Sequence, residues 1–356
     1  MAIGAIQTAD RLLLLCRPGF ESDCGLEIQA LAESIGVYGY IKTKSRQGFV
    51  EFILYDVSRL KDIVDLIKVD RLIFSRDAMM TGPLIENLNT LDRVSDMLAV
   101  LSPSFRCSKI VDWAVDSNEG KSLSKLTRKL LKPLELGLES AGHWQAENHD
   151  SLCMLFTATD QCYLGSLPRN ACPKWPNSIA HLRFPAAAPS RSTLKLEEAI
   201  LFFLDAKEQQ RAFGLGKTAV DLGACPGGWT YQLVRRELQV TAIDNGPMDE
   251  QLMATGQVDH LKVDGFHYQP KYPVNWLVCD MIEKPLRIAE LMADWVAQGW
   301  AQSAIFNLKL PMKKRYQEVV LCQQVIAERL GAKPYELKIK QLYHDREEVT
   351  AYLHAL

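Results

Sequence analysis

A glycine-rich stretch in the second half of the chain constrains the fold more than any other feature. It reads Asp221-Leu222-Gly223-Ala224-Cys225-Pro226-Gly227-Gly228-Trp229-Thr230, between the apolar runs 218–220 and 231–234. This pattern predicts a strand, a tight turn and a helix. Glycines permit torsions and close ligand approach that a Cβ would block, and a helix start offers free N–H groups. We interpret the turn as a candidate nucleotide cradle, the alternative being an ordinary tight strand-to-helix turn.

Acidic residues flank this turn. Asp221 opens it, and Asp244 follows about 20 residues later, where an α/β nucleotide fold holds a ribose hydroxyl at the end of its second strand. No Gly-Lys-Ser/Thr follows the turn, and the Gly-x-Gly-x-x-Gly spacing is absent. The turn is therefore neither a P-loop nor a typical dinucleotide-binding loop.

Composition indicates an ordinary globular protein. The chain has 356 residues, enough for two or three domains, with 47% hydrophobic and 24% charged residues and a net charge of −2. No apolar run approaches a membrane span, and residues 12–16 are too short for a signal-peptide core, so we expect a cytoplasmic protein without a membrane partner. Nine scattered cysteines without a Cys-x-x-Cys pair favour reduced thiols over disulfides or zinc, and we expect no metal.

The second half, residues 191–356, alternates helices and strands. We predict helices at 194–206, 230–237, 286–298 and 316–330, and strands at 218–222, 240–243, 259–263, 275–279, 303–308, 334–339 and 349–353. This alternation predicts an α/β fold: a mostly parallel sheet with helices on both faces and ligands at the carboxyl ends of the strands. The last two strands are expected to form an antiparallel hairpin at the edge.

The first half reads as α+β. Residues 1–80 show a β-α-β-β-α-β order, with strands at 11–16, 37–41, 48–54 and 72–74 and helices at 27–35 and 57–67, which suggests a ferredoxin-like unit. Residues 81–167 follow, with helices at 84–100 and 121–137 and strands at 105–115, 151–157 and 161–164. The second of these helices carries one basic face, which is either a phosphate contact or a solvated surface: Lys121, Lys125, Arg128, Lys129 and Lys132. Residues 168–190 form a proline-punctuated linker.

Four ionisable residues stand at element ends in the second half. Asp280 and Lys309 each follow a predicted strand, Glu348 precedes one, and Lys195 opens a helix. All four could converge above one sheet edge. Taken singly, each would more often be a solvated or salt-bridged residue than a catalytic one.

Together with the loop, these residues carry a family resemblance. Asp-x-Gly-x-x-Pro-Gly-Gly-Trp resembles the S-adenosylmethionine loop of the FtsJ-type ribose 2′-O-methyltransferases, and the four charged residues resemble the Lys-Asp-Lys-Glu tetrad of that family. The segment 190–196 is similar to its Ser-Arg-x-x-aromatic-Lys-Leu motif, although Leu194 replaces the aromatic residue. Glu347 beside Glu348 leaves the tetrad glutamate open by one residue.

The resemblance implies a Rossmann-like methyltransferase domain that uses S-adenosylmethionine. Lys309 would act as general base, with Asp280 paired to it and bordering the sulfonium, and Lys195 and Glu348 positioning the ribose. A lysine can serve as a base only when it is neutral. Asp244 would bind the adenosine ribose and Asp264 the adenine amino group. The implied cofactor-binding residues are Ser192, Asp221, Gly223, Cys225, Pro226, Gly227, Gly228, Trp229, Asp244, Asp264 and Asp280.

The first half suggests what the enzyme would act on. Residues 105–164 resemble a THUMP domain, an RNA-binding module, in the order of their elements. The two-part arrangement and the segment 343–349 resemble a branch of the FtsJ-type family, which implies a cytidine of bacterial 23S ribosomal RNA as acceptor; we expect a monomer. Two alternatives stay open: a 2′-O-methyltransferase acting on another RNA, and a catalytically silent RNA-binding or ribosome-assembly protein. Base methylation is disfavoured because neither an Asn/Asp-Pro-Pro-Tyr site nor paired catalytic cysteines occur.

Overall fold

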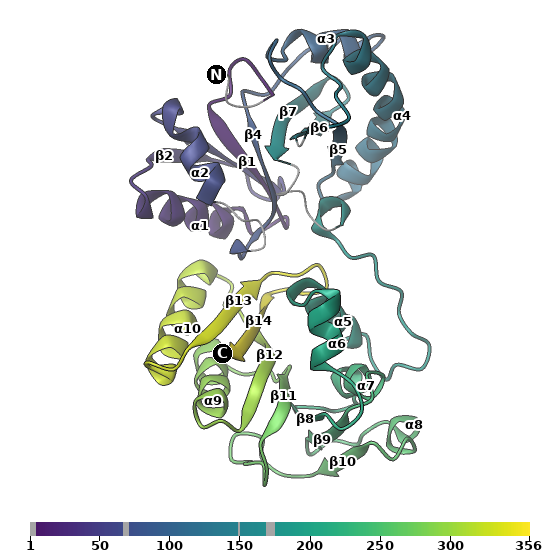
Figure 1. The fold of residues 1–356 in the computed structure, drawn as a ribbon, viewed down its shortest axis with the longest axis vertical. Helices are drawn as coiled ribbons and strands as arrows, with labels where there is room; N and C mark the ends of the chain where they lie inside the picture. Colours follow the sequence, from purple (N-terminus) through teal and green to yellow (C-terminus); the bar gives the residue numbers. More distant parts are fainter. Residues whose placement is uncertain (1–4, 67–70, 149, 169–174) are drawn as a thin grey trace. The chain divides into compact units, whose positions relative to one another are not determined.

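The chain divides into two compact units. The computed structural model describes residues 5–66, 71–148, 150–168 and 175–356. Contacts separate an amino-terminal unit, Met1–Ile179, from a carboxyl-terminal unit, Ala180–Leu356 (Figure 1). The finer division at residues 80, 167 and 190 stays a prediction, and residues 169–174 of the predicted linker lie outside the described residues. None of the described helices combines the length and apolarity needed to cross a membrane.

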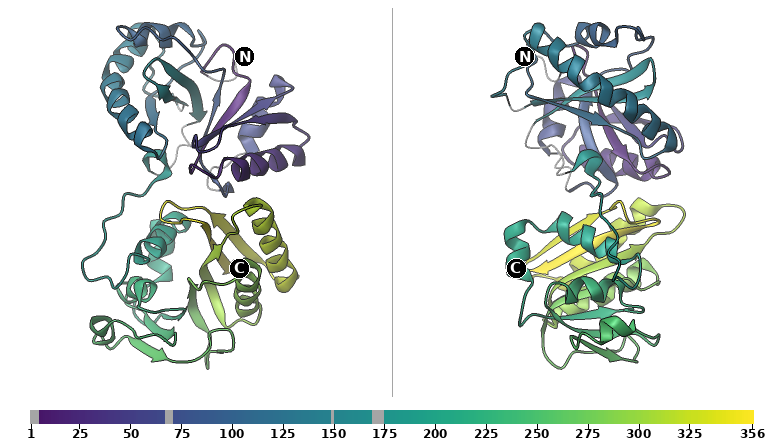
Figure 2. Two further views of the ribbon diagram at one scale, coloured as in Figure 1. Left: turned by 180° about the vertical axis from the view of Figure 1, so that it is seen from behind. Right: turned by 90° about the vertical axis from the view of Figure 1, so that its right-hand side faces the viewer.

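One seven-stranded sheet forms the amino-terminal unit, in the order β2-β3-β1-β4-β7-β6-β5. Its first half is ferredoxin-like, as predicted, and β4 and β7 pair antiparallel so that the sheet continues without a break into the second half. Helices α1 and α2 belong to the first half and α3 and α4 to the second (Figures 1 and 2). The elements are β1 (Arg11–Cys16), α1 (Glu21–Ser34), β2 (Gly39–Lys42), β3 (Phe49–Leu54), α2 (Leu60–Leu66), β4 (Ser75–Thr81), α3 (Arg93–Ala99), β5 (Lys109–Trp113), α4 (Asn118–Ser140), β6 (Asp150–Ala158) and β7 (Gln161–Pro168).

The strand predicted at residues 72–74 is wrong. These apolar residues are buried in a loop, and the strand is β4, which begins at Ser75. The carboxylate of Glu27 explains the difference, because it accepts hydrogen bonds from the backbone N–H groups of Ile73 and Phe74 and so replaces a strand partner. The helix predicted to end at residue 67 ends at Leu66, and residue 67 lies outside the described residues.

The helix predicted at residues 84–100 is also wrong over most of its length. Only Arg93–Ala99 is helical, and Asp92 caps its start by accepting a hydrogen bond from the N–H of Ser95 at 3.2 Å. Upstream, Ile85 forms a β-bridge to Cys162, and Asn87 has a left-handed φ of 59°. The apolar residues before Arg93 have helical spacing but lie in a loop, because polar residues that favour turns interrupt the helical backbone conformation there.

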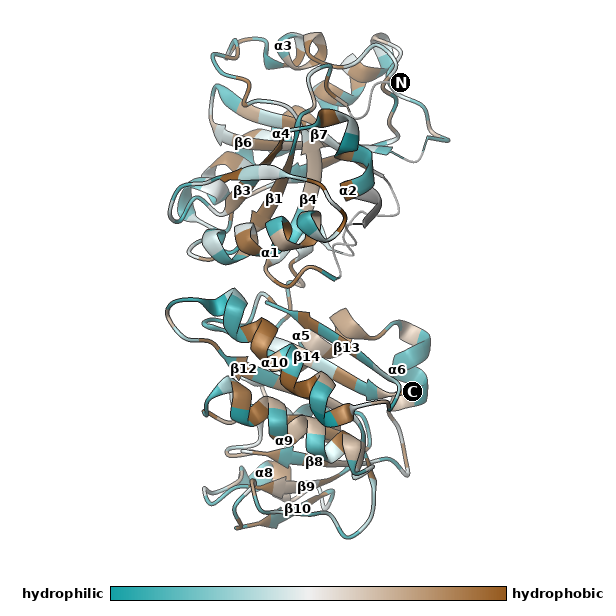
Figure 3. Ribbon diagram, turned by 90° about the vertical axis from the view of Figure 1, so that its left-hand side faces the viewer, coloured by the Kyte–Doolittle hydropathy of each residue, from teal (hydrophilic) through white to brown (hydrophobic). Residues whose placement is uncertain are grey.

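The carboxyl-terminal unit is the predicted α/β fold. Its seven-stranded sheet has the order β10-β9-β8-β11-β12-β14-β13, with α5, α6 and α7 on one face and α9 and α10 on the other (Figures 1 and 3). Strands β8 to β12 pair in parallel, and the β13–β14 hairpin is antiparallel and closes the edge, as predicted. The strands are β8 (Thr218–Leu222), β9 (Gln239–Ile243), β10 (Val258–Leu261), β11 (Val274–Cys279), β12 (Ala301–Lys309), β13 (Tyr335–Lys340) and β14 (Glu348–Ala355).

The helices of this unit lie close to the predicted ranges, with two additions. They are α5 (Thr193–Phe203), α6 (Ala206–Ala212), α7 (Gly228–Val234), α8 (Glu250–Met253), α9 (Pro285–Ala297) and α10 (Arg315–Leu330). The helix predicted at residues 194–206 ends earlier because Asp205 and Glu208 form a capping box that starts α6. That Asp-x-x-Glu signal is present in the sequence and was missed.

Candidate active site

Four charged side chains meet at one edge of the carboxyl-terminal sheet. The Lys195 ammonium lies 3.2 Å from Asp280 Oδ2 and 2.5 Å from Glu348 Oε1. The Lys309 ammonium contacts the other oxygen of each carboxylate, Asp280 Oδ1 and Glu348 Oε2. The four residues thus form a closed ring in which each lysine bridges both acids, and all four side chains are between 6% and 23% exposed.

Strand direction explains why residues so far apart in sequence meet. Asp280 directly follows β11 and Lys309 ends the parallel neighbour β12, so both reach the same edge. Strand β14 runs antiparallel to β12, which brings its first residue, Glu348, opposite Lys309 in the register. Lys195 comes from the first turn of α5.

The register also separates the two candidate glutamates. A shift of one residue reverses the face to which a strand side chain points. Glu348 contacts both lysines, whereas the Glu347 carboxylate lies 62% exposed and accepts a hydrogen bond of 2.6 Å from Arg315. Arg315 is therefore engaged with Glu347, whereas the preceding Lys313 and Lys314 are exposed.

The ring controls the charge of Lys309. Burial lowers the pKa of this ammonium, but Asp280 and Glu348 outweigh burial and raise the pKa above its ordinary value. In this arrangement Lys309 is held in its protonated form. A role as base therefore requires a further change that weakens the hold of the two carboxylates.

A buried polar layer that sequence reasoning missed lies beneath the ring. Asn307 Nδ2 donates to Asp280 Oδ1 at 2.9 Å, and Thr350 Oγ1 lies 2.8 Å from Asn307 Oδ1. Asp345 lies 3.0 Å from the same hydroxyl, and all three side chains are fully buried. A sequence signal was available: Asn307 and Thr350 are polar and stand two positions from Lys309 and Glu348, so each shares a strand face with its tetrad residue.

Counting protons assigns a direction to this layer. The Thr350 hydroxyl carries one proton and lies between two acceptors, Asn307 Oδ1 and Asp345. Burial, followed by the charge of Glu348, raises the pKa of Asp345 well above its usual range, and a protonated Asp345 would donate to Thr350. Thr350 then donates to Asn307 and Asn307 donates to Asp280. The chain fixes the orientation of the Asp280 carboxylate.

Glu198 holds α5 against the segment before β14. Its side chain is 1% exposed and accepts hydrogen bonds from the backbone N–H groups of Tyr343 and His344 at 2.9 and 2.8 Å. The His344 ring adds a third contact at 2.6 Å. Because Glu198 lies one helical turn after Lys195, these contacts fix Lys195 relative to Glu348.

The glycine-rich turn connects β8 to α7, as predicted. Gly223 has a φ of +77°, and a Cβ there would lie 2.5 Å from Met281 Cγ. A Cβ on Gly228 would lie 2.3 Å from Ser192 Oγ. Asp221 is 1% exposed, and the Thr230 hydroxyl donates to it at 2.6 Å. Asp221 thus lies under the turn and ties its two ends together, and burial raises its pKa to about 7.

Asp244 lies beside the turn, and Asp264 follows β10 with an exposed carboxylate. Asp244 accepts hydrogen bonds from Cys225 N at 3.0 Å and Gly246 N at 2.8 Å, which leaves lone pairs on both oxygens for a ribose diol. Asp264 is 56% exposed, accepts from Phe266 N at 2.9 Å, and hydrogen bonding keeps its pKa below the usual value. An adenosine carries the matching donors, two ribose hydroxyls and an exocyclic amine. The acceptors of Asp244 and Asp264 therefore fit the predicted cofactor.

The remaining predicted loop residues take different positions. Trp229 is 3% exposed and packs in the core of the unit, whereas Ser192 lies within 2.6 Å of Ser190 Oγ beside the turn. Cys225 donates its thiol to the Pro247 carbonyl at 3.0 Å, and burial raises its pKa, which favours the thiol over the thiolate. Cys16, Cys107, Cys162, Cys225, Cys279 and Cys322 carry free thiols, and no group of metal-binding side chains occurs among the described residues.

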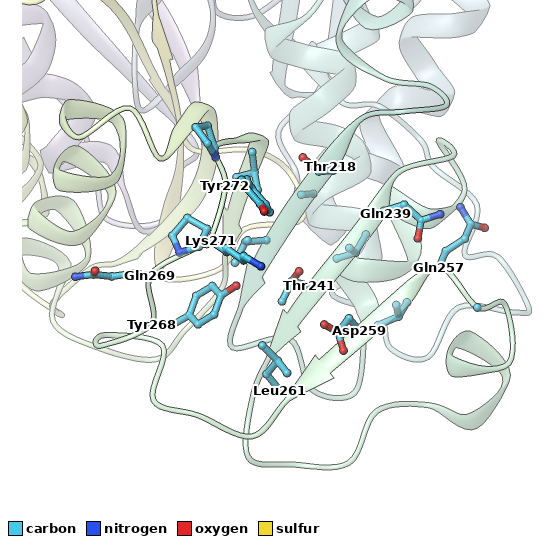
Figure 4. Close-up of a pocket in the computed structure, with 18 residues that line it drawn as sticks. Thr218, Gln239, Thr241, Gln257, Asp259, Leu261, Tyr268, Gln269, Lys271 and Tyr272 are labelled. Atoms are coloured by element: carbon cyan, nitrogen blue, oxygen red, sulfur yellow. The ribbon is translucent and has the colours of Figure 1, made fainter.

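Two cavities of about 620 Å³ lie in this unit. One adjoins Lys309 and is bordered by Arg287, Leu310 and Pro311, beside the ring. The other, shown in Figure 4, lies over the β8–β10 part of the sheet, where Tyr268, Lys271 and Thr241 surround it. No residue of the predicted site lines the second cavity.

Comparisons with known proteins agree with this geometry. Residues 188–326 match the FtsJ-like methyltransferase model, residues 9–79 the RlmM ferredoxin-like domain, and residues 92–167 the model "Ribosomal RNA large subunit methyltransferase M, N-terminal". Proteins named ribosomal RNA large subunit methyltransferase M are similar over almost their whole length. That of Cellvibrio japonicus is 45% identical over 97% of this chain and 99% of its own, and that of Sodalis glossinidius is 44% identical over 96% of each.

The fold and the matched models define an FtsJ-like methyltransferase with a ferredoxin-like amino-terminal region. The predicted family resemblance is therefore confirmed. More narrowly, the chain belongs to the ribosomal RNA large subunit methyltransferase M family.

Proposed function

We propose that this enzyme transfers a methyl group from S-adenosylmethionine to the ribose 2′-hydroxyl of a cytidine in bacterial 23S ribosomal RNA. The observation that carries the proposal is the ring in which Lys195 and Lys309 each bridge Asp280 and Glu348. A ribose hydroxyl is too weak an acid to react without a base, and this ring places one lysine among groups that tune its pKa. The names of the relatives support ribosomal RNA as the substrate.

Lys309 is the proposed general base. When bound, the cofactor supplies an electrophilic methyl group on a positively charged sulfur. A cation held beside Asp280 would compete with Lys309 for that carboxylate, lower the pKa of Lys309 and allow its proton to pass to solvent. The neutral amine then accepts the proton of the 2′-hydroxyl, while Lys195 and Glu348 hold the ribose in line with the methyl group.

The turn and its acids form the proposed cofactor site. Asp244 would accept hydrogen bonds from the adenosine ribose, Asp264 from the adenine amine, and Gly223 and Gly228 would let the backbone approach the methionine part. Asp221 is buried, so its proposed contribution is to hold the turn in shape through Thr230. Ser192, Cys225 and Pro226 would border the same ligand.

The amino-terminal unit is the proposed RNA-binding part, and its second half the proposed THUMP-like module. Its basic face on α4 supports this role, because Lys121, Lys125, Arg128, Lys129 and Lys132 are all exposed. Such contacts with phosphate position an RNA without reading its sequence. The proposed location is the cytoplasm, and the proposed active form is a monomer.

Mapping of ribose methylation tests this function. Ribosomal RNA from cells lacking the protein should lose one 2′-O-methylcytidine of the 23S molecule, and expression of the wild-type chain should restore it. Loss of a base methylation instead, or of a ribose methylation on another RNA, would contradict the proposal. An unchanged methylation map would favour a ribosome-assembly role without catalysis.

A further inference from the structure

A cleft in the amino-terminal unit takes no part in the proposed methyl transfer. It has a volume of about 770 Å³ and is partly open to solvent. The turn between β2 and β3, the start of α4 and the β6–β7 hairpin surround it. Its lining includes Arg11, Lys44, Arg46, Glu51, Leu123 and Tyr163.

The floor of the cleft is a buried polar network. Arg11, Glu51 and Tyr163 are 8%, 3% and 3% exposed. Arg11 Nη1 donates to Glu51 Oε2 at 2.5 Å, and the Tyr163 hydroxyl also hydrogen-bonds Glu51. Burying an ion pair costs several kcal/mol per ion and seldom stabilises a fold. Its position in an open cleft therefore favours a role in binding.

The rim of the cleft is basic on one side. Lys44 and Arg46 lie in the β2–β3 turn and are exposed, and neither has an ion-pair partner among the residues that the structure describes. Lys42, on the adjacent strand, lies 3.5 Å from Glu51 and links the rim to the floor. Two unpaired cations on a short turn suit a phosphate group.

The walls are apolar and aromatic. Phe49 and Tyr163 pack edge to face with ring centroids 5.7 Å apart, and Leu84 and Leu123 add further apolar lining, although Glu86 and Glu119 also line the cleft. Such walls suit a planar base, which stacks or packs on apolar side chains without regard to sequence. The Glu51 carboxylate accepts hydrogen bonds, and the amide of Gln161 both donates and accepts, so the lining can contact the polar edge of that base.

We propose that this cleft binds one unpaired nucleotide of an RNA strand, with its phosphate at Lys44 and Arg46 and its base against the apolar wall beside Tyr163. A paired nucleotide does not fit this description, because its base is stacked inside a duplex and its polar edge is occupied. The choice of RNA as ligand rests on the proposed function. The cleft itself is independent of the methyltransferase site.

Binding of a short oligoribonucleotide tests the proposal. The probe is a fluorescein-labelled single strand of mixed sequence, measured by fluorescence anisotropy with the full chain carrying Lys309→Ala and without S-adenosylmethionine. Binding is then independent of methyl transfer, so its outcome is distinct from that of the proposed function. We expect the single strand to bind more tightly than the same sequence in a duplex.

A double variant that reverses two charges at the rim tests whether the RNA strand binds in this cleft. Lys44→Glu with Arg46→Glu should weaken single-strand binding by at least about tenfold, because two phosphate contacts become repulsive. The matched control is Lys61→Glu with Lys109→Glu, which makes the same charge change at exposed positions outside the cleft. Equal losses in the two pairs would indicate a general charge effect and overturn the proposal.

One further variant and one further kind of ligand complete the test. Leu123→Ala should weaken binding without altering charge. An unchanged affinity would show that the base does not pack on this apolar wall. Free nucleoside 5′-monophosphates should compete weakly. Binding of the strand no tighter than that of the monophosphates would assign the cleft to a small nucleotide and overturn its assignment to RNA. Thermal unfolding of each variant checks that the unit is folded.

Discussion

Lys309 and Glu348 lie opposite each other in the antiparallel pair of β12 and β14, and the Lys309 ammonium contacts the Glu348 carboxylate. Because Glu348 is only 6% exposed, its charge acts on Lys309 with little screening by solvent. The same carboxylate also binds Lys195. One register position therefore fixes both the location and the protonation of the proposed base.

Removing this carboxylate should change the pH dependence of methyl transfer. Asp280 and Glu348 raise the pKa of Lys309, so the neutral fraction of the wild-type lysine, and with it the rate, should increase with pH above neutrality. In Glu348→Gln one of the two carboxylates that raise the pKa of Lys309 is lost, so burial lowers that pKa further. The rate should then increase at a lower pH than in the wild type. Rates from pH 6 to pH 10 measure this shift. Superimposable profiles would exclude Glu348 as the group that tunes Lys309.

The buried layer under the ring should affect both stability and rate. Thr350→Val keeps the shape of the side chain but leaves Asn307 Oδ1 and Asp345 without their shared partner. An unsatisfied buried polar group costs about 1–3 kcal/mol of unfolding free energy. The free Asn307 amide should also loosen Asp280 and lower kcat. Urea unfolding and steady-state kinetics measure the two effects, and Thr350→Ser, which keeps the hydroxyl, serves as the control.

Gly228→Ala should weaken cofactor binding. The added Cβ would lie 2.3 Å from Ser192 Oγ and 2.5 Å from Ser190 Oγ, so the two serine side chains or the turn must shift. We expect a loss of at least tenfold in affinity for S-adenosylmethionine, about 1.4 kcal/mol, by isothermal titration calorimetry. Replacing both serines by alanine removes the obstructing oxygens and should recover part of the affinity. If Gly228→Ala binds the cofactor normally, close packing at this turn is not required.

Asp221 should make stability depend on pH in an unusual direction. Burial raises its pKa to about 7, whereas the unfolded chain has a value near 3.9. Its contribution is therefore complete below about pH 4 and is lost as pH rises to about 7, by about 1.4 kcal/mol per pH unit at most. Asp221→Asn cannot ionise and should gain stability relative to wild type above pH 7. Urea unfolding at pH 5 and pH 8 compares the two, with Asp259→Asn as an exposed control. A constant difference would contradict the assigned pKa.

Sequence patterns predicted the carboxyl-terminal unit well, for a physical reason. Each buried parallel strand is a short apolar run, and the residue after it lies at the ligand-binding edge, so Asp280 and Lys309 could be selected from the sequence alone. Their proposed roles stay predictions. The position of strand β4 was predicted wrongly because Arg76 and Asp77 are charged although they are buried. A search for apolar runs or apolar alternation does not detect such a strand.

Other parts depended on pairing that a sequence does not display. Asn307, Thr350 and Asp345 form a layer only because β12 and β14 pair in one register. Glu198 likewise shows its role only when α5 meets the segment before β14. The junction of β4 with β7, which makes one sheet of the amino-terminal unit, rests on two residue pairs far apart in the chain.

Methyl transfer by Lys309→Ala tests the central claim most directly. Wild-type enzyme, S-adenosylmethionine and undermethylated 23S ribosomal RNA should yield 2′-O-methylcytidine, identified by mass spectrometry of the digested RNA. Lys309→Ala should lower kcat by at least about 100-fold, the usual contribution of a general base, while cofactor affinity changes little. Lys207→Ala, at an exposed lysine of α6 outside the site, should retain activity. Full turnover by Lys309→Ala, or methylation of a base in place of the ribose, would contradict the account.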